Sequence, residues 1–300
     1  MILIFSQNDD YSTNEIIKWL ISYKKPYIRV HEDEVFDVRI LKKRILLKSD
    51  RNDFYIDEID SVWYRRGGLK LLRLEYMNAS INTHMMETQH WIADYIIKTL
   101  ESKKHINKIS SSIINKLVVL EIAEKVGLQV PQYYLSDNTD DVVLNKTIIK
   151  SIAGNAILYN FEKETDAAIY TSIVSVKEKE PFFITFFQEY IEKDFEIRTF
   201  YLNGKCWSTA IISQNDKKTQ IDHRHYNHSK PNRNVPYNLP NILEEKIKIL
   251  MEKLDLNCGS IDLLKKGEEF YFLEINPIGQ FTGHSNICNY NLENIIADYL

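Results

Sequence analysis

Three oxygen-bearing side chains late in the sequence have the spacing of a cation site on paired strands. Glu274 and Asn276 alternate with Ile275, so in a β-strand both side chains point to one face. Asp262 lies in the preceding apolar segment, within hairpin distance, and its carboxylate can join that face. Hard oxygen ligands suit Mg²⁺, which proteins usually hold with few of their own groups plus phosphates. Alternatively, the three residues could lie on a solvent-exposed face of a sheet. The apolar residues around them favour burial, and buried oxygens need a binding partner.

Cationic side chains upstream could bind the phosphates that accompany such a cation. Lys150 ends a strand-like segment and leads into small residues, whose loop amides can add hydrogen bonds to phosphate oxygens. Lys116 lies near the start of a predicted helix. Arg198 shares a strand face with Glu196 and could clamp a carboxylate or a transferring phosphoryl group. Each lysine, considered alone, could instead be an ordinary solvated surface residue. The Glu–Arg pair could instead be a cross-strand ion pair.

Residues 187–191 form an apolar segment that Gln188 and Glu189 interrupt. Backbone and side-chain polar groups beside apolar walls are what a bound adenine ring requires. The alternative is an ordinary buried strand that runs out to the surface.

Other nucleotide and hydrolase motifs are absent from the sequence. It contains no GxxxxGK[ST], no GxGxxG after a strand and no GxSxG. P-loop, Rossmann and α/β-hydrolase interpretations therefore lack their defining residues. His223, His225 and His228 lie in a polar stretch without a partner cysteine, so we interpret them as a loop and not as a zinc site. Arg224 in the same stretch could contact an anionic substrate.

A scaffold must bring these residues together, and the hydrophobic pattern predicts an α+β protein that begins with a small α/β domain over residues 1–110. Ser12 and Glu15 have the spacing of a capping box that opens a helix. A second, long helix is predicted over residues 81–101. The predicted strands of this domain are residues 2–5, 27–30, 45–48 and 61–65.

The remainder is predicted as a central part, residues 111–185, and a C-terminal part, residues 186–300. A helix over residues 111–126 should end at Gly127. Residues 162–173 look helical, and Pro240 precedes another amphipathic helix. Asn203-Gly204 is a strong hairpin signal between two strands. The predicted strands are residues 146–150, 183–191, 195–202, 205–213, 259–264 and 269–276.

Bulk composition excludes several classes of protein. The chain has 300 residues and a net charge of −4, which argues against a protein that mainly coats nucleic acid. Its three cysteines are too scattered for a disulfide framework or a CxxC metal site. The N-terminal apolar stretch is too short for a signal peptide, and no segment is long enough to span a bilayer. We expect a soluble, cytoplasmic protein.

The order of the motifs is more specific than any one of them. The chain reads NKLVVLEIAEKVGLQVP, IIKSIAG, FQEYIEKDFEIRTFYLNGK, SIDLL and YFLEINPIGQF in succession. Over residues 115–281 this resembles the ATP-grasp superfamily. The opening ILIFSQNDDYSTNEIIKWL, together with VWYRRG, is similar to the grasp-with-spasm branch of the microviridin-type graspetide synthetases. The resemblance implies an ATP-grasp fold behind a pre-ATP-grasp-like N-terminal domain.

The resemblance also implies roles for individual residues. ATP phosphates would contact Lys116 and Lys150. The adenine hinge would comprise Gln188, Glu189, Tyr190 and Ile191. The ribose would be reached by Asp194 or Glu196, and the sequence does not choose between them. The γ-phosphate and the acyl phosphate would bind Arg198, and Mg²⁺ would bind Asp262, Glu274 and Asn276. The acidic peptide would face Arg65, Arg66 and Arg224.

The activity implied is ATP-dependent crosslinking of a ribosomal precursor peptide that has a leader and an acidic core. A homodimer is a further expectation from the resemblance. An ATP-grasp ligase of the RimK type, which adds amino acids, would share every ATP residue. A non-catalytic peptide- or nucleotide-binding module is the alternative of a different class, and the intact set of Asp262, Glu274 and Asn276 disfavours it.

Overall fold

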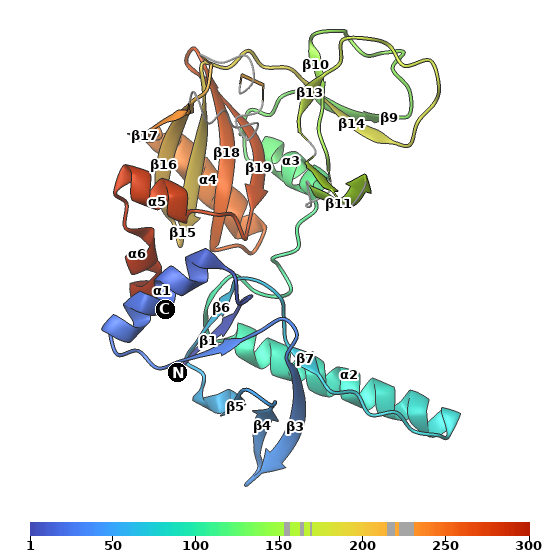
Figure 1. Ribbon diagram of the computed structural model, residues 1–300, viewed down its shortest axis with the longest axis vertical. Helices are drawn as coiled ribbons and strands as arrows, with labels where there is room; N and C mark the ends of the chain where they lie inside the picture. Colours follow the sequence, from blue (N-terminus) through green and yellow to red (C-terminus); the bar gives the residue numbers. More distant parts are fainter. Residues whose placement is uncertain (153–156, 163–164, 169, 215–219, 222–230) are drawn as a thin grey trace. The chain divides into compact units, whose positions relative to one another are not determined.

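The computed structural model describes residues 1–152, 157–162, 165–168, 170–214, 220–221 and 231–300 (Figure 1). These residues divide into two compact units. The first unit comprises Met1–Ile113, Asp255–Cys258 and Pro277–Leu300, and the second comprises Ile114–Leu254 and Gly259–Asn276. Each unit has its own sheets, and each is described separately below.

The first unit is built on a parallel sheet in the order β2-β1-β6-β8. Its strands are β1 (Ile2–Phe5), β2 (Tyr27–Val30), β6 (Ser61–Tyr64) and β8 (Lys104–Ile106). All residues of β1 and β6 are buried, which explains why their sequences are apolar without strict alternation. The strands predicted over residues 2–5, 27–30 and 61–65 are confirmed.

Helix α1 (Tyr11–Ser22) connects β1 to β2, and its first turn corrects the sequence prediction. The N-cap is Asp10, whose Oδ1 accepts the Thr13 N–H at 3.0 Å, so the predicted capping box that starts at Ser12 is wrong. Asp10 and not Ser12 is the N-cap because the Asp10 side chain reaches the backbone amide three residues later, which is the geometry of an N-cap. Ile16 and Leu20 anchor the inner face of the helix in the core.

A second sheet of the first unit has the order β5-β4-β3-β7. The strands are β3 (Val35–Leu41), β4 (Arg44–Lys48), β5 (Asp53–Tyr55) and β7 (Lys70–Leu71), of which the sequence predicted only residues 45–48. Phe36, Leu47 and Phe54 from this sheet are buried in the same core as Phe5 and Tyr64. Two late helices, α5 (Thr282–Cys288) and α6 (Leu292–Tyr299), complete the unit, and α6 packs against α1.

Helix α2 (Ala79–Glu101) is the longest helix of the described chain, and it buries little of its length. Ile96 and Leu100, near its end, are its buried residues. Ile81, Trp91 and Tyr95 are each more than half exposed, although they are large and apolar. The predicted helix over residues 81–101 is therefore confirmed, but most of its apolar face is not covered by the described chain.

The second unit opens with α3 (Lys116–Lys125). Asn115 caps this helix by accepting the Leu117 and Val118 amides, so the predicted start at residue 111 is wrong. Gly127 follows the helix with φ +81°, the left-handed conformation expected of a terminating glycine. A four-stranded sheet in the order β13-β10-β14-β9 comes next. Its strands are β9 (Tyr133–Ser136), β10 (Thr147–Ile149), β13 (Ser172–Ile173) and β14 (Thr185–Glu189).

The helix predicted over residues 162–173 is wrong. The described part of this region forms an antiparallel hairpin of β11 (Ile157–Glu162) and β12 (Thr165–Ala168), and β13 begins at Ser172. Pairing between the two strands overrides the helix propensity of the alanines, which is only a weak local preference.

The second sheet of this unit carries the late motifs. It has the order β17-β16-β15-β18-β19 and is antiparallel between β15 (Phe195–Leu202) and β16 (Lys205–Ile212) and between β18 (Cys258–Lys266) and β19 (Glu269–Asn276). β17 (Arg233–Tyr237) forms one edge, and α4 (Asn241–Lys253) buries Leu243, Ile247, Leu250 and Met251. Asn203 and Gly204 both have positive φ, as a type I′ hairpin turn requires.

Candidate active site

A pocket lies in the second unit and is lined by residues of both of the sheets β13-β10-β14-β9 and β17-β16-β15-β18-β19. Strands β10, β14, β15, β18 and β19 all contribute to its walls. Most of the residues that the sequence singled out line it: Lys150, Gln188, Glu189, Tyr190, Ile191, Glu196, Arg198, Asp262 and Glu274. Residues separated by more than a hundred positions in the chain therefore meet at one cavity.

Glu274 is the anionic centre of one wall. Its Oε2 lies 2.8 Å from the Lys150 Nζ and 3.0 Å from the Lys116 Nζ. Lys116 reaches it from the first residue of α3 and also donates to the Ser151 carbonyl at 3.0 Å. Burial alone would raise the pKa of Glu274, but Lys150 and Lys116 together lower it to about 2. The carboxylate is therefore ionised at neutral pH and is held by two cations.

Asp262 and Arg198 form a second ion pair in the same pocket. The Arg198 Nε and Nη2 donate to the two Asp262 oxygens at 2.8 and 2.7 Å, which is a bidentate geometry. The attraction of Asp262 raises the pKa of the Arg198 guanidinium, so this cation does not titrate in the working range. β15 and β18 are neighbours in the sheet, which places the two side chains together.

The carboxylates of Asp262 and Glu274 form a donor set that suits Mg²⁺. They face each other in the register of β18 and β19, next to a β-bulge at Asp262. Asn276 lies at the exposed end of β19, opposite Ser260, and does not line the pocket. Within the described residues no group of three or more His, Cys, Asp or Glu could hold a metal alone. Two carboxylates fit an ion that takes few protein ligands and completes its shell with phosphate oxygens and water.

The backbone N–H groups of the predicted hinge differ in whether the described chain supplies an acceptor. The Glu189 N–H donates to the Gln132 carbonyl at 2.7 Å, and the Tyr190 N–H donates to the Lys146 carbonyl at 2.8 Å. The Ile191 N–H has no acceptor in the described chain. Gln188 is buried, and the apolar walls beside the hinge come from Ile148, Leu264 and Leu273. A flat heterocycle with an acceptor nitrogen matches this arrangement.

Asp194 and Glu196, the two alternatives for ribose contact, have different surroundings. Asp194 is exposed, lies outside the pocket lining and accepts the Gly267 N–H at 2.8 Å, so its side chain holds the β18–β19 turn. Glu196 is buried and lines the pocket. The geometry therefore favours Glu196 over Asp194 as a group that a pocket ligand can touch.

Lys193 lines the pocket as well, and the sequence analysis did not single it out. Its ammonium is buried and lies 2.6 Å from the Glu196 Oε1. The residue belongs to the short link between β14 and β15. Such a link has no periodicity from which a side-chain direction can be inferred, and opposite charges three residues apart were the only available signal.

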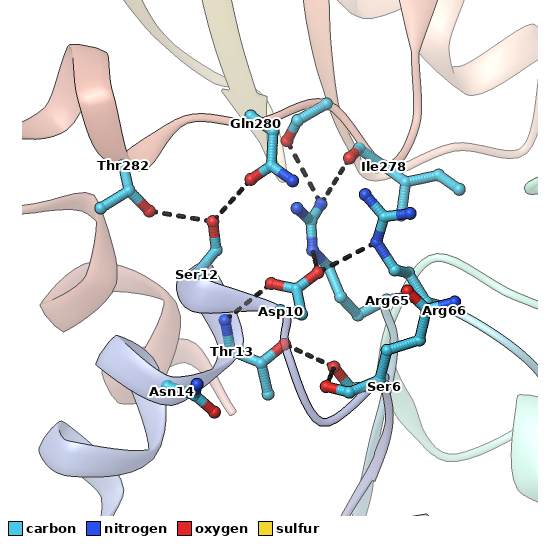
Figure 2. Close-up of polar contacts among 12 residues, drawn as sticks. Ser6, Asp10, Ser12, Thr13, Asn14, Arg65, Arg66, Ile278, Gln280 and Thr282 are labelled. Carbon is cyan, nitrogen blue, oxygen red and sulfur yellow. Dashed lines mark hydrogen bonds and ion pairs between the residues drawn. The ribbon is translucent and has the colours of Figure 1, made fainter. Parts of the chain in front are cut away.

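Arg65 and Arg66 belong to the first unit and lie in a polar cluster around Asp10 (Figure 2). The Nε of each arginine donates to the Asp10 Oδ2 at 3.1 Å. The Arg65 side chain is 3% exposed, and its Nη1 also donates to the carbonyls of Ile278 and Gly279, at 2.6 and 3.2 Å. The Arg66 side chain is 36% exposed. Arg66 is thus the member of this pair that solvent or a ligand can reach.

The rest of this cluster ties the start of α1 to residues 280–282. The Ser12 hydroxyl donates to the Gln280 Oε1 and accepts from the Thr282 hydroxyl, both at 2.9 Å (Figure 2). We call Asp10, Ser12, Arg65, Arg66, Gln280 and Thr282 the Asp10 cluster. The third arginine predicted to face the substrate, Arg224, lies outside the described residues.

No protein-family model matches the sequence, and no curated protein matches it. Solved structures do match it over the whole chain. The macrocyclase MdnC of Microcystis aeruginosa MRC, bound with precursor peptide MdnA, is 25% identical, with a TM-score of 0.76 and coverage of 100% of this chain and 99% of MdnC.

Two further solved structures carry nucleotides. A Chryseobacterium gregarium RiPP-associated ATP-grasp ligase, in complex with ADP and a leader and core peptide, is 20% identical, with a TM-score of 0.76 and coverage of 99% of this chain and 94% of that one. The ATP-grasp ligase PsnB, complexed with a phosphomimetic minimal precursor, Mg and ADP, is 14% identical, with a TM-score of 0.69 and coverage of 99% and 96%. The fold of this chain is that of the ATP-grasp ligases.

Proposed function

We propose that this chain is an ATP-dependent ligase that crosslinks a ribosomal precursor peptide. It would activate side-chain carboxylates of Asp or Glu as acyl phosphates and join them to Ser or Thr hydroxyls, or to a Lys amine, of the same peptide. The observation that carries the proposal is the pocket in which Asp262 and Glu274 meet Arg198 and Lys150, with Lys116 paired to Glu274 beside it. The likeness to MdnC with its bound precursor peptide supports the choice of substrate.

ATP would bind with its adenine between the apolar walls of the pocket. The Ile191 N–H would donate to a ring nitrogen, and backbone carbonyl groups of the hinge at residues 188–191 would accept from the exocyclic amine. Glu196 would accept hydrogen bonds from the ribose hydroxyls. Buried polar groups of this kind fix the orientation of a ligand whose affinity comes mostly from its apolar contacts.

The phosphates would extend toward Glu274. Their oxygens compete with this carboxylate for Lys116 and Lys150, because phosphate carries more charge and more acceptors. Lysines drawn onto the phosphates would leave Glu274, with Asp262 beside it, to hold Mg²⁺. Asn276, which does not line the pocket, is the third ligand predicted from the sequence. Bound Mg²⁺ would neutralise the charge that accumulates on the β- and γ-phosphate oxygens.

The reaction then needs little covalent help from the protein. An oxygen of the peptide carboxylate attacks the γ-phosphorus, the bond to the β,γ-bridging oxygen breaks, and ADP leaves. A hydroxyl or amine of the peptide attacks the acyl carbon, and inorganic phosphate leaves with the former carboxylate oxygen, so the peptide loses one water. Arg198, fixed in place by two hydrogen bonds, would stabilise the negative charge on the transferring group. Both reacting groups belong to one peptide, which raises their effective concentration.

The precursor peptide would bring a leader and an acidic core. Arg66 supports this part of the proposal, because within the described residues only its Nε is bound, to Asp10, which leaves four of its five guanidinium N–H donors for a ligand. Arg224 remains a candidate for the same role. Arg65, which is buried and bound to two backbone carbonyls, fits the role of holding the fold better than that of touching peptide.

A homodimer is also proposed, and the exposed face of α2 supports it. Ile81, Thr88, Ile92 and Tyr95 follow one another at helical spacing, and the charged residues of the helix lie on other faces. An uncharged stripe of this length can pair with its own copy in an isologous interface. Ile92→Asp, in the middle of this stripe, should convert a dimer into a monomer in light scattering, whereas Thr83→Asp, on the opposite side of the helix, should not. A monomeric unmodified protein would refute the dimer.

We assign the enzyme to the cytoplasm, which supplies ATP. The three cysteines of the sequence form no disulfide with one another, which is compatible with a reducing compartment. Among the described residues, the structure contains no helix that is both long and apolar enough to cross a membrane.

To test the proposal, the protein is incubated with ATP, Mg²⁺ and an acidic peptide that contains Thr and Lys and is encoded beside it. The intact mass of the peptide is then measured. Successive losses of about 18 Da, the mass of one water lost in each condensation, are expected in wild type. Mild alkali then distinguishes the products, since it cleaves esters and leaves amides intact. A mass gain of one amino-acid residue would support the RimK-type alternative, and ADP binding without any mass change would support a binding module.

A further inference from the structure

The pocket contains a buried ammonium whose position neither the phosphates nor the metal ligands explain. Lys193 is 8% exposed, and its Nζ donates to the Glu196 Oε1 at 2.6 Å and to the Ile221 carbonyl at 2.8 Å. Lysine is rarely buried unless it is paired, so this placement requires an explanation. Lys193, Glu196 and Ile221 all line the pocket.

Hydrogen bonds of the next residue, Asp194, hold the backbone around Lys193 in place. The Asp194 N–H donates to the Lys265 carbonyl at 2.7 Å, and the Asp194 carboxylate accepts the Gly267 N–H at 2.8 Å. The link between β14 and β15 is thereby fixed to the β18–β19 turn. A fixed backbone limits the rotamers of Lys193, so its ammonium has a defined position relative to Glu196.

We propose that Lys193 is a positioning residue for nucleotide recognition, which holds the Glu196 carboxylate in the orientation that accepts the ribose hydroxyls. This inference rests on the proposed ATP-dependent function and deepens it by assigning the residues that recognise the ribose. An ammonium has three N–H donors, and the described chain uses two of them at Lys193. No described residue accepts the third, which can therefore donate to a hydroxyl oxygen of the ribose.

The chemistry of a vicinal diol fits this pair. Each ribose hydroxyl can donate to a carboxylate and accept from an ammonium, so Glu196 and Lys193 together satisfy both functions. Hydrogen bonds to charged groups are stronger than neutral ones, and a 2′-deoxy sugar leaves the pair with an unused buried donor and acceptor. The pocket should therefore prefer ribonucleotides to 2′-deoxyribonucleotides.

The test compares ADP with 2′-deoxy-ADP by isothermal titration in the presence of Mg²⁺, with the full-length protein. Wild type is expected to bind ADP about tenfold to a hundredfold more tightly, as the loss of one hydrogen bond to a charged group implies. Lys193→Met should abolish most of this preference by weakening ADP and leaving 2′-deoxy-ADP nearly unchanged. Lys193→Arg, which keeps the charge, should restore part of it, and the exposed Lys205→Met should have no effect.

Two outcomes would overturn the inference. One is equal weakening of both nucleotides by Lys193→Met, which a merely structural lysine would give. The other is a wild-type protein that does not discriminate between the sugars. If Lys193→Met fails to fold because Glu196 is left buried without its partner, the double variant Lys193→Met/Glu196→Gln removes both charges and must also lack the preference. A wild-type protein that binds neither nucleotide would refute the proposed function itself.

Discussion

The chain contains two centres in which cations surround a carboxylate, and they differ in what else surrounds it. At the Asp10 cluster, the Asp10 side chain has no exposed surface and also accepts a helix amide, while Arg65 donates to two backbone carbonyls. In the pocket, the side chains of Glu274, Lys116 and Lys150 are 21, 19 and 13% exposed. Within the described chain, the Glu274 carboxylate has cations as partners and no backbone amide donates to it.

This difference separates a structural ion cluster from a reactive one. Backbone groups cannot leave their side-chain partners without local unfolding, so the Asp10 cluster has one stable arrangement. Side-chain partners in a pocket can exchange one anion for another, which a ligase needs when it binds and releases phosphates. Charge alone does not reveal function, since the nature of the neighbouring groups decides whether the ions can move.

The largest effect is expected on catalysis in the pocket. Asp262→Asn and Glu274→Gln should each lower the rate of water loss from the peptide by about a thousandfold or more, the range for removing an electrostatic group that stabilises a transition state. Intact-mass kinetics measure this rate. Glu268→Gln, an exposed neighbour, is the matched control and should retain full activity. Wild-type rates in both pocket variants would contradict the assignment of the site.

Substitution of Asp10, the centre of the Asp10 cluster, should change the stability of the protein. Asp10→Ala should lower the free energy of unfolding by about 3–5 kcal/mol, because it leaves the buried Arg65 charge uncompensated. Chemical denaturation measures this change. Asp9→Ala, at an exposed neighbouring position, is the control. Asp10→Asn separates the two contributions, since asparagine caps a helix as well as aspartate does but lacks the charge. A stability change below 1 kcal/mol in Asp10→Ala would remove the contrast between the two centres.

Acid should weaken the pocket ion pairs. The folded pKa of Glu274, about 2, is lower than the value of 4.5 for an unperturbed glutamate, so the stability from its ionised form is complete above pH 4.5. That stability is lost as the pH falls toward 2 and amounts at most to about 3 kcal/mol. Denaturation of wild type and Glu274→Gln between pH 6 and 3 should give curves that converge in acid. Parallel curves would show that Glu274 contributes no pH-dependent stability.

The smallest effect distinguishes the two arginines of the cluster. Arg66→Ala should change stability by less than about 1 kcal/mol, as expected of a partly exposed ion pair, and should raise the KM for the precursor peptide several-fold. Arg65→Ala should lower stability by about 3 kcal/mol, because it removes a buried partner of Asp10. Peptide titrations and denaturation curves on the same preparations separate the two effects. An unchanged KM in Arg66→Ala would remove this residue from the peptide-binding surface.

The sequence predicted those features that depend on the residues of a single strand or turn. The alternation in residues 269–276 predicted the strand β19 that carries Glu274, and the Asn203-Gly204 hairpin was predicted from the turn residues alone. Helix ends were harder, because Asp10 and Ser12 are both good capping residues and the structure is needed to tell which one reaches an amide.

Contacts that depend on distant pairing could not be predicted from local patterns. Lys116 meets Glu274 across more than 150 residues, and only the packing of α3 beside β19 brings them together. The hairpin of β11 and β12 replaced a predicted helix for the same reason, since each strand is stabilised by its partner. Lys193 was missed because nothing in a short irregular link indicates where a side chain points.

The order of the segments has a consequence for synthesis on the ribosome. Residues 277–300 belong to the first unit, but they are translated after the second unit, Ile114–Leu254 and Gly259–Asn276. At about 5–20 residues per second, the start of α1 waits roughly 13–54 s for Gln280 and Thr282 to emerge. The nascent first unit therefore exposes the surface that α6 later covers, and it is a candidate client for ribosome-associated chaperones during that interval.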